Sequence, residues 1–573
     1  MSITVLLSFL LFTGFVVVFT YSKVKNDKHT SQDGFFLGGR SLTGGLIASS
    51  LILTNLSATS FVGMSAQSYT HNMSVMGWEV ASGVTLVIIA LLLVPRYLKQ
   101  GITTIPDFLE SRYDMSVKKF VTLLFLCQYV INILPTTLYA GAVVLGEIFD
   151  VQGLLGISEF SSIALISATI GLLGFFYAIY GGLKAVVIAD TINGVGLITG
   201  GLMIPVFGLM ALGGGNFMEG LDVLLTAAPE KLQSVGKETD PLPFSTLFTG
   251  LLLVNLYYWG TDQSIIQRAL GAKNLKEGQK GVILAGAIKV ISPLFLIIPG
   301  IIAFHMFGAD AGNPDTMYTR LVNEVLPKPL VGFFVAVMFG AILSTFNGVL
   351  NSSTTLFALN VYKPLFGKDK SDEELVGKGR IFGVIIAIIS VCIAPFIMYA
   401  PEGLFQYLQM VAGFFSVPIF TIVFVGYISK RVPAIAAKVA LVVFVSSYAA
   451  MQLVFGTPIH FLHQLAILFV VCTALMFAIG HFMPRETDYV IPVNENIDVT
   501  PWSFRFEASA VIIYMVLGAY VMFSDFGFVS SDPTIMQVYG FCGLVLMFGV
   551  VSNYFIKRRK HKQVTKLNDM YMP

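Results

Sequence analysis

Charged side chains are scarce in this sequence. Asp, Glu, Lys and Arg make up 12% of the 573 residues, whereas a soluble domain carries about 25%. Hydrophobic residues make up 55%, and the mean hydropathy is +0.79. This composition excludes an ordinary soluble protein and predicts a polytopic membrane protein. The net charge of +2 says little about partners, because charges in such a chain act through their position along the loops.

Cysteine is rarer still, and histidine forms no cluster. The cysteines all lie in apolar stretches, so they predict neither a disulfide framework nor a metal site; they are Cys127, Cys392, Cys472 and Cys542. The sequence has no nucleotide-binding glycine loop, no Walker motif and no catalytic-triad signature. These absences argue against an enzyme, an organic cofactor, a nucleic-acid partner and transport driven directly by ATP.

The sequence does have many apolar runs that are long enough to cross a membrane. The first, from Ile3 to Tyr21, lacks a basic start and a small-residue cleavage site, so we expect a retained helix and not a signal peptide. Fifteen membrane helices are predicted, at about 2–22, 43–70, 74–99, 117–148, 161–185, 187–214, 245–271, 279–307, 330–362, 378–399, 403–429, 433–454, 461–483, 507–525 and 534–556.

Lys and Arg are concentrated in alternate loops, namely those after the first, third, seventh, ninth and eleventh predicted helices, and in the tail after 557. Because basic loops face the cytoplasm, we expect the N-terminus outside and the C-terminus inside, which requires an odd number of helices. The segment 215–244 then lies outside as a short surface helix. Compact loops without disulfides favour a bacterial inner (plasma) membrane, although the topology also fits a eukaryotic plasma membrane.

Two hydroxyl side chains lie deep inside one apolar run. Ser344 and Thr345 follow Ala341, and a second interrupted apolar segment spans 53–57 near the N-terminus. Oxygen ligands can replace the hydration shell of a small hard cation, and paired interrupted segments indicate a transport site. The alternative is that the two hydroxyls bond to their own helix.

Several predicted spans also contain charged or amide side chains, which are costly in lipid and by default face a cavity and carry function. They are Glu79, Asp190, Asn193, Asn255, Asp262, Gln263, Lys289, Asn347, Asn351, Gln406 and Gln409. Two structural alternatives are open: Glu79 and Lys289 only fix helix packing by pairing with each other, and the asparagines only join neighbouring helices.

Other polar and aromatic residues near the span ends have alternatives of their own. Asp190 could be partly solvated at a cytoplasmic helix end, and Tyr257 to Trp259 could form an interfacial aromatic belt. Lys184 and Arg268 are expected to extend their charged ends to the membrane interface.

Seven short stretches of the sequence point to a known family. They are FFLGGRSL at 35–42, NLSA at 55–58, TIPDFLE at 104–110, YGGL at 180–183, NLYYWG at 255–260, IIQR at 265–268 and AILST at 341–345. With them the chain resembles, over nearly its whole length, the sodium:solute symporter family in its bacterial sodium/galactose (sodium/glucose cotransporter-like) branch. Within that branch it resembles uncharacterised enterobacterial symporters with an extra C-terminal helix.

The resemblance implies an all-α, leucine-transporter-type core of two inverted five-helix units. The units would lie at about 43–214 and 245–429, separated by the extracellular loop 215–244. An extra helix and loop at 1–42 would precede them, and accessory helices with a basic tail at 430–573 would follow. The implied sodium site consists of the backbone carbonyls of Leu53, Leu56 and Ala341 and the hydroxyls of Ser344 and Thr345. Asp190 matches an acidic residue on the ion exit path.

The resemblance also implies a sugar site. Its polar residues would be Asn55, Glu79, Ser82, Asn255, Lys289 and Gln409, with Tyr258 as an aromatic gate that stacks on the sugar ring and Phe405 as an apolar lid. Such a set suits a polyol, which needs several donors and acceptors and an aromatic face. Ser60 departs from the family, which has a glutamine there, and this leaves room for a sugar or polyol other than galactose.

The expected function is therefore sodium-coupled symport of a small polar solute, a sugar or polyol, by alternating access, with sodium and membrane lipids as further partners. One alternative is a sodium symporter for an organic solute that is not a sugar. Another is a transporter-like sensor, which would normally carry a signalling domain where this chain has a short basic tail. A sodium-leak channel would leave the polar pocket unexplained.

Overall fold

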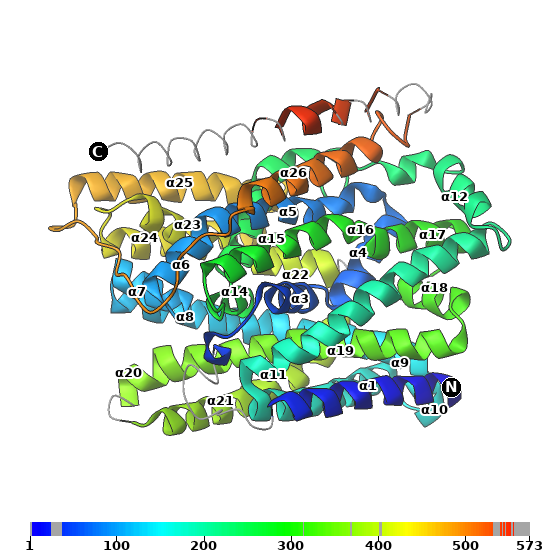
Figure 1. Cartoon of the computed structure of the whole chain (residues 1–573), viewed down its shortest axis with the longest axis horizontal. Helices are drawn as coiled ribbons and strands as arrows, with labels where there is room; N and C mark the ends of the chain where they lie inside the picture. Colours follow the sequence, from blue (N-terminus) through cyan, green and yellow to red (C-terminus); the bar gives the residue numbers. More distant parts are fainter. Residues whose placement is uncertain are drawn as a thin grey trace, which may run out of the picture.

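The computed structural model describes residues 3–24, 37–312, 314–366, 370–399 and 404–530, and of the later residues 539–540, 543–544, 546–551 and 554. The side chains of 175–185 and 404–407 are outside this description. Within the described ranges the chain forms helices that run side by side along one axis, and no β-sheet (Figure 1). Ten of these helices are long and apolar enough to cross a membrane, and two bent helix pairs raise the number to twelve.

The predicted number of fifteen membrane helices is not confirmed. The predicted span 161–185 and its successor 187–214 form one helical element, α11, from Glu159 to Leu212. The sequence has no proline before Pro205 in this stretch, so nothing in it obliges the helix to stop. The predicted span 245–271 is broken into short helices, and 534–556 lies mostly outside the described residues.

The first half of the chain supplies a peripheral helix and then a series of membrane helices. Two of these contain a turn of π-helix, at Ile89–Leu93 and Tyr129–Ile133. The α-helices are α1 (Ile3–Val24), α3 (Gly44–Asn55), α4 (Ala58–Thr70), α5 (Gly77–Ile88), α6 (Val94–Gln100), α7 (Ile105–Arg112), α8 (Met115–Gln128), α9 (Leu134–Phe149), α10 (Val151–Leu155) and α11. The short helix α12 (Phe217–Thr226) confirms the prediction of a surface helix within 215–244.

The second half repeats the pattern of broken and π-containing helices. Its π-helical turns are Phe357–Tyr362 and Ala450–Phe455. The α-helices are α13 (Gly250–Gly260), α14 (Gln263–Leu270), α15 (Leu275–Ile291), α16 (Pro293–Leu296), α17 (Ile298–Phe307), α18 (Met317–Val325), α19 (Lys328–Leu356), α20 (Lys363–Phe366), α21 (Asp372–Ile393), α22 (Leu404–Ala412), α23 (Ser416–Ile428), α24 (Ala434–Ala449), α25 (Phe461–Phe482) and α26 (Arg505–Met522).

Helix α3 lies in the middle of the bundle, where it packs against α11, α15 and α19 (Figure 1). On one side of it, α5 crosses α15 closely because small residues meet there. A Cβ at Gly83 would come within 2.7 Å of Val290, and one at Gly286 within 3.2 Å of Ile512 on α26. This close crossing brings the polar residues of α5 and α15 together inside the bundle.

Candidate functional site

The break between α3 and α4 is the first component of the site. The two helices are bent by 58°. The Leu56 N–H donates to the Ile52 carbonyl at 2.7 Å and ends α3, and Ser57 is extended. The break expected in the NLSA stretch is therefore confirmed. It leaves the negative carbonyl end of α3 and the positive amide end of α4 within the bundle.

The two hydroxyls predicted to bind sodium lie against the last turn of α3. Thr345 Oγ1 donates to the backbone carbonyl of Thr54 at 2.8 Å, and Ser344 Oγ lies 3.4 Å from Thr54 Oγ1. Leu53, Leu56 and Ala341, whose carbonyls complete the predicted set, are fully buried. Because the Thr345 hydroxyl donates to α3, it joins two helices and does not bond to its own helix.

A buried ion pair forms the wall of the site on α5 and α15. Lys289 Nζ donates to Glu79 Oε2, and the two side chains are 1% and 2% exposed. The same lysine donates to Asn55 Oδ1 at 2.5 Å. The hydroxyl of Ser292, at the 45° bend that follows α15, also donates to Glu79 Oε2. Glu79 Oε1 accepts no hydrogen bond from a described residue.

Further polar side chains connect this pair to α13. Asn55 Nδ2 donates to the Tyr258 hydroxyl at 3.3 Å, and Ser82 Oγ donates to Asn255 Oδ1 at 2.7 Å. Ser60 Oγ donates to the backbone carbonyl of Asn55 at 3.2 Å, across the helix break. Asn255 thus joins α13 to α5, as expected if the asparagines link neighbouring helices. It also lines the cavity described below.

These residues surround a central cavity of about 140 Å³. Its lining includes Thr345 from the predicted sodium set and eight of the predicted solute-binding residues. These eight are Asn55, Ser60, Glu79, Ser82, Asn255, Tyr258, Lys289 and Gln409. The side chain of Phe405 lies outside the described ones. Among the described residues of the lining, Glu79 and Lys289 are the only acidic and basic ones, and their charges cancel.

The lining also contains residues that sequence reasoning missed. They include Thr54, Ser57, Thr59, Trp78, Thr136, Thr137 and Trp259. Thr54 and Ser57 belong to the interrupted segment 53–57, so its polar pattern was a usable signal for both. Ser292 lies just behind the lining, and the Ser-Pro step before Pro293 was a signal for a bend at this point. No signal indicated that the Ser292 hydroxyl would reach Glu79.

The predicted span 245–271 is broken between α13 and α14, and the polar residues at this break bond to neighbouring helices. Asp262 is fully buried at the break and accepts hydrogen bonds from Tyr129 at 2.8 Å and Tyr257 at 3.2 Å. It also caps α14 by accepting the Ser264 N–H at 2.8 Å. Asp262 therefore fixes the helix break and does not line the central cavity. Gln263 likewise joins α14 to the start of α7, where it accepts the Ile105 N–H at 2.9 Å.

One expectation and two alternatives about residues near the span ends are wrong. Arg268 does not extend to the membrane interface, because every residue of α14 is buried, and its Nε donates to Ser50 Oγ at 3.0 Å. Asp190 is not partly solvated, since it is buried and accepts the Ser50 hydroxyl at 2.6 Å.

The aromatic belt is the second alternative that is wrong, because Tyr257 and Trp259 are buried inside the bundle. Of the remaining polar residues predicted in the spans, Asn193, Asn347 and Asn351 are buried. The side chains of Lys184 and Gln406 lie outside the described ones.

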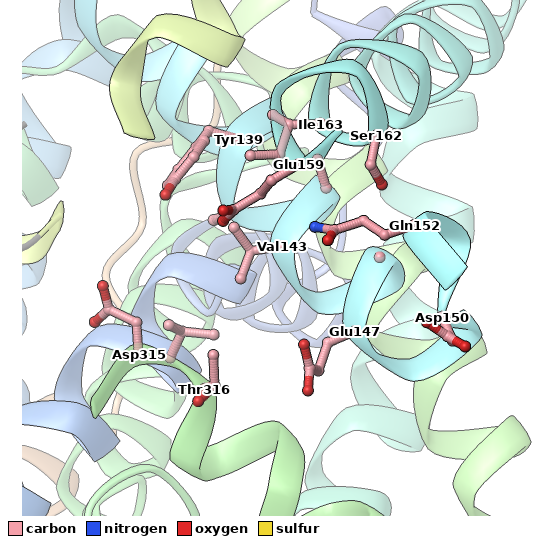
Figure 2. A pocket seen from close by; sticks show the side chains of 14 residues that line it. Tyr139, Val143, Glu147, Asp150, Gln152, Glu159, Ser162, Ile163, Asp315 and Thr316 are labelled. Carbon is pink, nitrogen blue, oxygen red and sulfur yellow. The ribbon is translucent and has the colours of Figure 1, made fainter. Parts of the chain in front are cut away.

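A second cavity, of about 320 Å³, lies further along α9 than the central cavity (Figure 2). Thr137 lines the central cavity and Tyr139 lines this one. Figure 2 shows that acidic side chains surround it; they are Glu147, Asp150, Glu159 and Asp315. Burial raises the pKa of the Asp315 carboxyl. None of the predicted solute or sodium residues lines this cavity.

Comparison with known proteins identifies the family. The model of the sodium:solute symporter family matches residues 35–443, which is more than half of the chain. This chain belongs to that family. It is therefore a multi-pass secondary transporter with sodium as its coupling ion, and not an enzyme.

Similar full-length proteins support the assignment. The symporter is 45% identical over 556 residues to the uncharacterized symporter YidK of Escherichia coli (strain K12), and the match covers 97% of each chain. It is 31% identical over 523 residues to the sodium/glucose cotransporter of Vibrio parahaemolyticus, with 87% of this chain and 93% of the relative covered. The predicted resemblance to this family and branch is confirmed.

A solved structure supports the fold. The substrate-bound, outward-open structure of a sodium-coupled sialic acid symporter matches with a TM-score of 0.72 at 19% identity. The match covers 85% of this chain and 100% of that one. The all-α, leucine-transporter-type fold class expected from the sequence is confirmed.

Proposed function

We propose that this symporter uses the sodium gradient to import a small polyhydroxylated solute, a sugar or polyol, through the central cavity by alternating access. One observation carries the proposal. The cavity joins the Glu79–Lys289 pair, the amides Asn55, Asn255 and Gln409 and the ring of Tyr258. Acceptors, donors and an aromatic face around a small volume are what several hydroxyl groups on an apolar ring require.

Sodium would bind at the negative end of α3. The proposed ligands are the carbonyls of Leu53, Leu56 and Ala341 and the hydroxyls of Ser344 and Thr345. The contact of Thr345 with Thr54 supports this set, because it brings α19 to the last turn of α3. An ion at this point would hold the two helices together and fix the break beside the solute cavity. Separation of α3 from α19 would then release both sodium and solute.

The exit path and the topology complete the proposal. Asp190, with Ser50 and Arg268, would line the route by which sodium leaves, because Ser50 lies one turn before Thr54 on α3. The two inverted units would be 43–214 and 245–429. Each begins with a broken helix, α3–α4 in the first and α13–α14 in the second, which supports the repeat. The protein would lie in a bacterial inner membrane with its N-terminus outside.

Counterflow in proteoliposomes tests the proposal. Vesicles that contain the purified protein are loaded with unlabelled glucose, galactose or myo-inositol and then exposed to the labelled compound, with sodium or with potassium. We expect sodium-dependent counterflow of at least one of these compounds, and none in vesicles without protein. Binding of such a compound without any counterflow would favour a sensor. Sodium-dependent counterflow of only non-sugar organic solutes would refute the sugar or polyol assignment.

A further inference from the structure

Three π-helical turns of this fold share one local pattern. In each, the residue just after the turn donates its N–H to the carbonyl five residues earlier, and a proline comes next. The donors are Val94, Leu134 and Lys363, the acceptors are Ile89, Tyr129 and Ala358, and the prolines are Pro95, Pro135 and Pro364. Proline has no N–H, and its ring clashes with the carbonyl four residues earlier. Each proline therefore gives its helix a reason to leave regular α-helical geometry at this point.

The turn before Pro135 is the one that lies at the central cavity. Its last residue, Ile133, lines that cavity, and so do Thr136 and Thr137 just after it. No described residue of the other two proline-linked turns lines the cavity. Single π-helical turns are frequent at functional sites, and the geometry of this one can act on a bound solute.

The same turn is fixed to two other walls of the bundle. The Tyr129 hydroxyl, at the start of the turn, donates to Asp262 at 2.8 Å, at the break between α13 and α14. Asn132 Nδ2 donates to the Leu408 carbonyl of α22 at 3.4 Å, and Leu408 lines the cavity. Tyr129 and Asn132 are both buried. These contacts fix the direction of the helix before Pro135, so the geometry of the turn decides where the residues after it point.

The two threonines after the turn offer hydrogen-bond acceptors to the cavity. Thr136 Oγ1 donates to the Asn132 carbonyl at 2.6 Å, and Thr137 Oγ1 donates to the Ile133 carbonyl at 2.7 Å. Their hydroxyl hydrogens are therefore used, but each oxygen can still accept a hydrogen bond. A hydroxyl group of a sugar or polyol could donate such a bond.

We propose that Pro135 is a positioning residue for the solute, because the π-helical turn that it favours points Thr136 and Thr137 into the central cavity as acceptors. An α-helix turns by about 100° per residue, and a π-helical turn holds one residue more than an α-helical turn. A regular α-helix here would rotate both threonines by about 100° relative to Tyr129 and remove at least one of them from the lining. The contact with the solute rests on the proposed function, whereas the direction of the threonines does not.

Cysteine modification tests the direction of the threonines. Thr136→Cys and Thr137→Cys are introduced singly into full-length protein whose own cysteines are replaced by serine or alanine. Their rates of reaction with aminoethyl methanethiosulfonate are then measured in proteoliposomes. Pro135→Ala restores the missing N–H and should lower the rate at one or both positions by about tenfold or more, because a thiol that leaves the cavity is shielded from water. Equal rates with and without Pro135→Ala at both positions would overturn the proposal.

The matched control is Pro364→Ala, which makes the same change after a π-helical turn that does not line the cavity. It should leave both modification rates unchanged, and an equal fall in the rates with Pro364→Ala would contradict a local effect of Pro135. If Pro135→Ala does not fold, Pro135→Gly restores the same N–H with a smaller side chain and gives the same comparison.

Transport kinetics test the contact with the solute. Counterflow is measured with whichever of glucose, galactose and myo-inositol the wild type transports. Thr136→Ala and Thr137→Ala should each raise KM by about 2- to 13-fold, the effect of one hydrogen bond, with little change in Vmax. Pro135→Ala should also raise KM, and the threonine substitutions should have a smaller effect in its presence. Pro364→Ala should leave KM unchanged.

The outcomes separate the two proposals. Counterflow in which both threonine substitutions leave KM unchanged would overturn the solute contact and leave the proposed function standing. Threonine substitutions that raise KM by the same factor with and without Pro135→Ala would also overturn it, because the proline would then act independently of them. Absence of sodium-dependent counterflow for all three compounds would overturn the proposed function, while the modification rates would still decide the direction of Thr136 and Thr137.

Discussion

Removal of one charge from the Glu79–Lys289 pair should cost more than removal of both. Glu79→Gln keeps the size of the side chain but leaves the Lys289 ammonium, which is 1% exposed, without a counter-charge. Loss of one partner of a buried pair typically costs about 3–5 kcal/mol of folding free energy. The double variant Glu79→Gln with Lys289→Met removes both charges and should recover most of that loss, because an uncharged replacement of a buried pair is often neutral.

Solute transport should respond differently from stability. Glu79 Oε1 is the oxygen left free for a solute hydroxyl, and a hydrogen bond to a charged group is worth about 1.5–3 kcal/mol. We therefore expect Glu79→Gln to reduce uptake at limiting solute by about 10- to 150-fold. The double variant should be as inactive as the single variant, even though it folds better, because the charged donor and acceptor are both gone.

Two measurements check this prediction. Thermal unfolding in detergent should rank the wild type first, the double variant second and Glu79→Gln last. Uptake into proteoliposomes should be high only for the wild type. Equal stability of Glu79→Gln and wild type would refute the account of a buried, uncompensated charge. A double variant that transports like the wild type would show that the pair serves only helix packing.

Three further predictions concern neighbouring residues and the topology. Ser292→Ala removes a donor to Glu79 and should weaken uptake by about tenfold or more, whereas Ser390→Ala, at a buried serine that donates to its own helix, should not; equal effects of the two would contradict a specific role for Ser292. Ser60→Gln should shift preference towards glucose or galactose by about 1–2 kcal/mol, or roughly 5- to 30-fold, read from competition uptake; an unchanged profile would place Ser60 outside the solute contacts. A C-terminal fluorescent fusion should be bright in the bacterial cytoplasm, and an active C-terminal alkaline phosphatase fusion would instead reverse the topology.

Local sequence alone indicated part of the candidate site. Polar groups at Glu79, Asn255 and Lys289 are costly in lipid, so their presence in apolar spans already indicated a shared interior. The break at 55–58 follows from the same interrupted pattern. The two interrupted segments, 53–57 and 341–345, already indicated a shared transport site, but the individual ligands were named only through the family resemblance.

What the sequence left undetermined depends on tertiary contacts. Arg268 looks like an interfacial residue in its local context, and only the packing of α14 inside the bundle buries it beside Ser50. Asp262 looks like a candidate ligand, but two tyrosines from separate helices close over it. The predicted helix count is not confirmed for a different reason: apolar length alone does not show where a long run such as α11 bends or ends.

Sodium dependence of transport tests the central claim most directly. The claim is that Ser344 and Thr345 supply oxygen ligands to the coupling ion at the end of α3. Ser344→Ala and Thr345→Ala should each raise the sodium concentration needed for half-maximal counterflow, while the protein stays folded and inserted. Ser353→Ala is the matched control on the same helix, since that buried hydroxyl donates to its own backbone at 2.8 Å, and it should leave the sodium dependence unchanged. Unchanged sodium activation in both Ser344→Ala and Thr345→Ala would contradict the assignment.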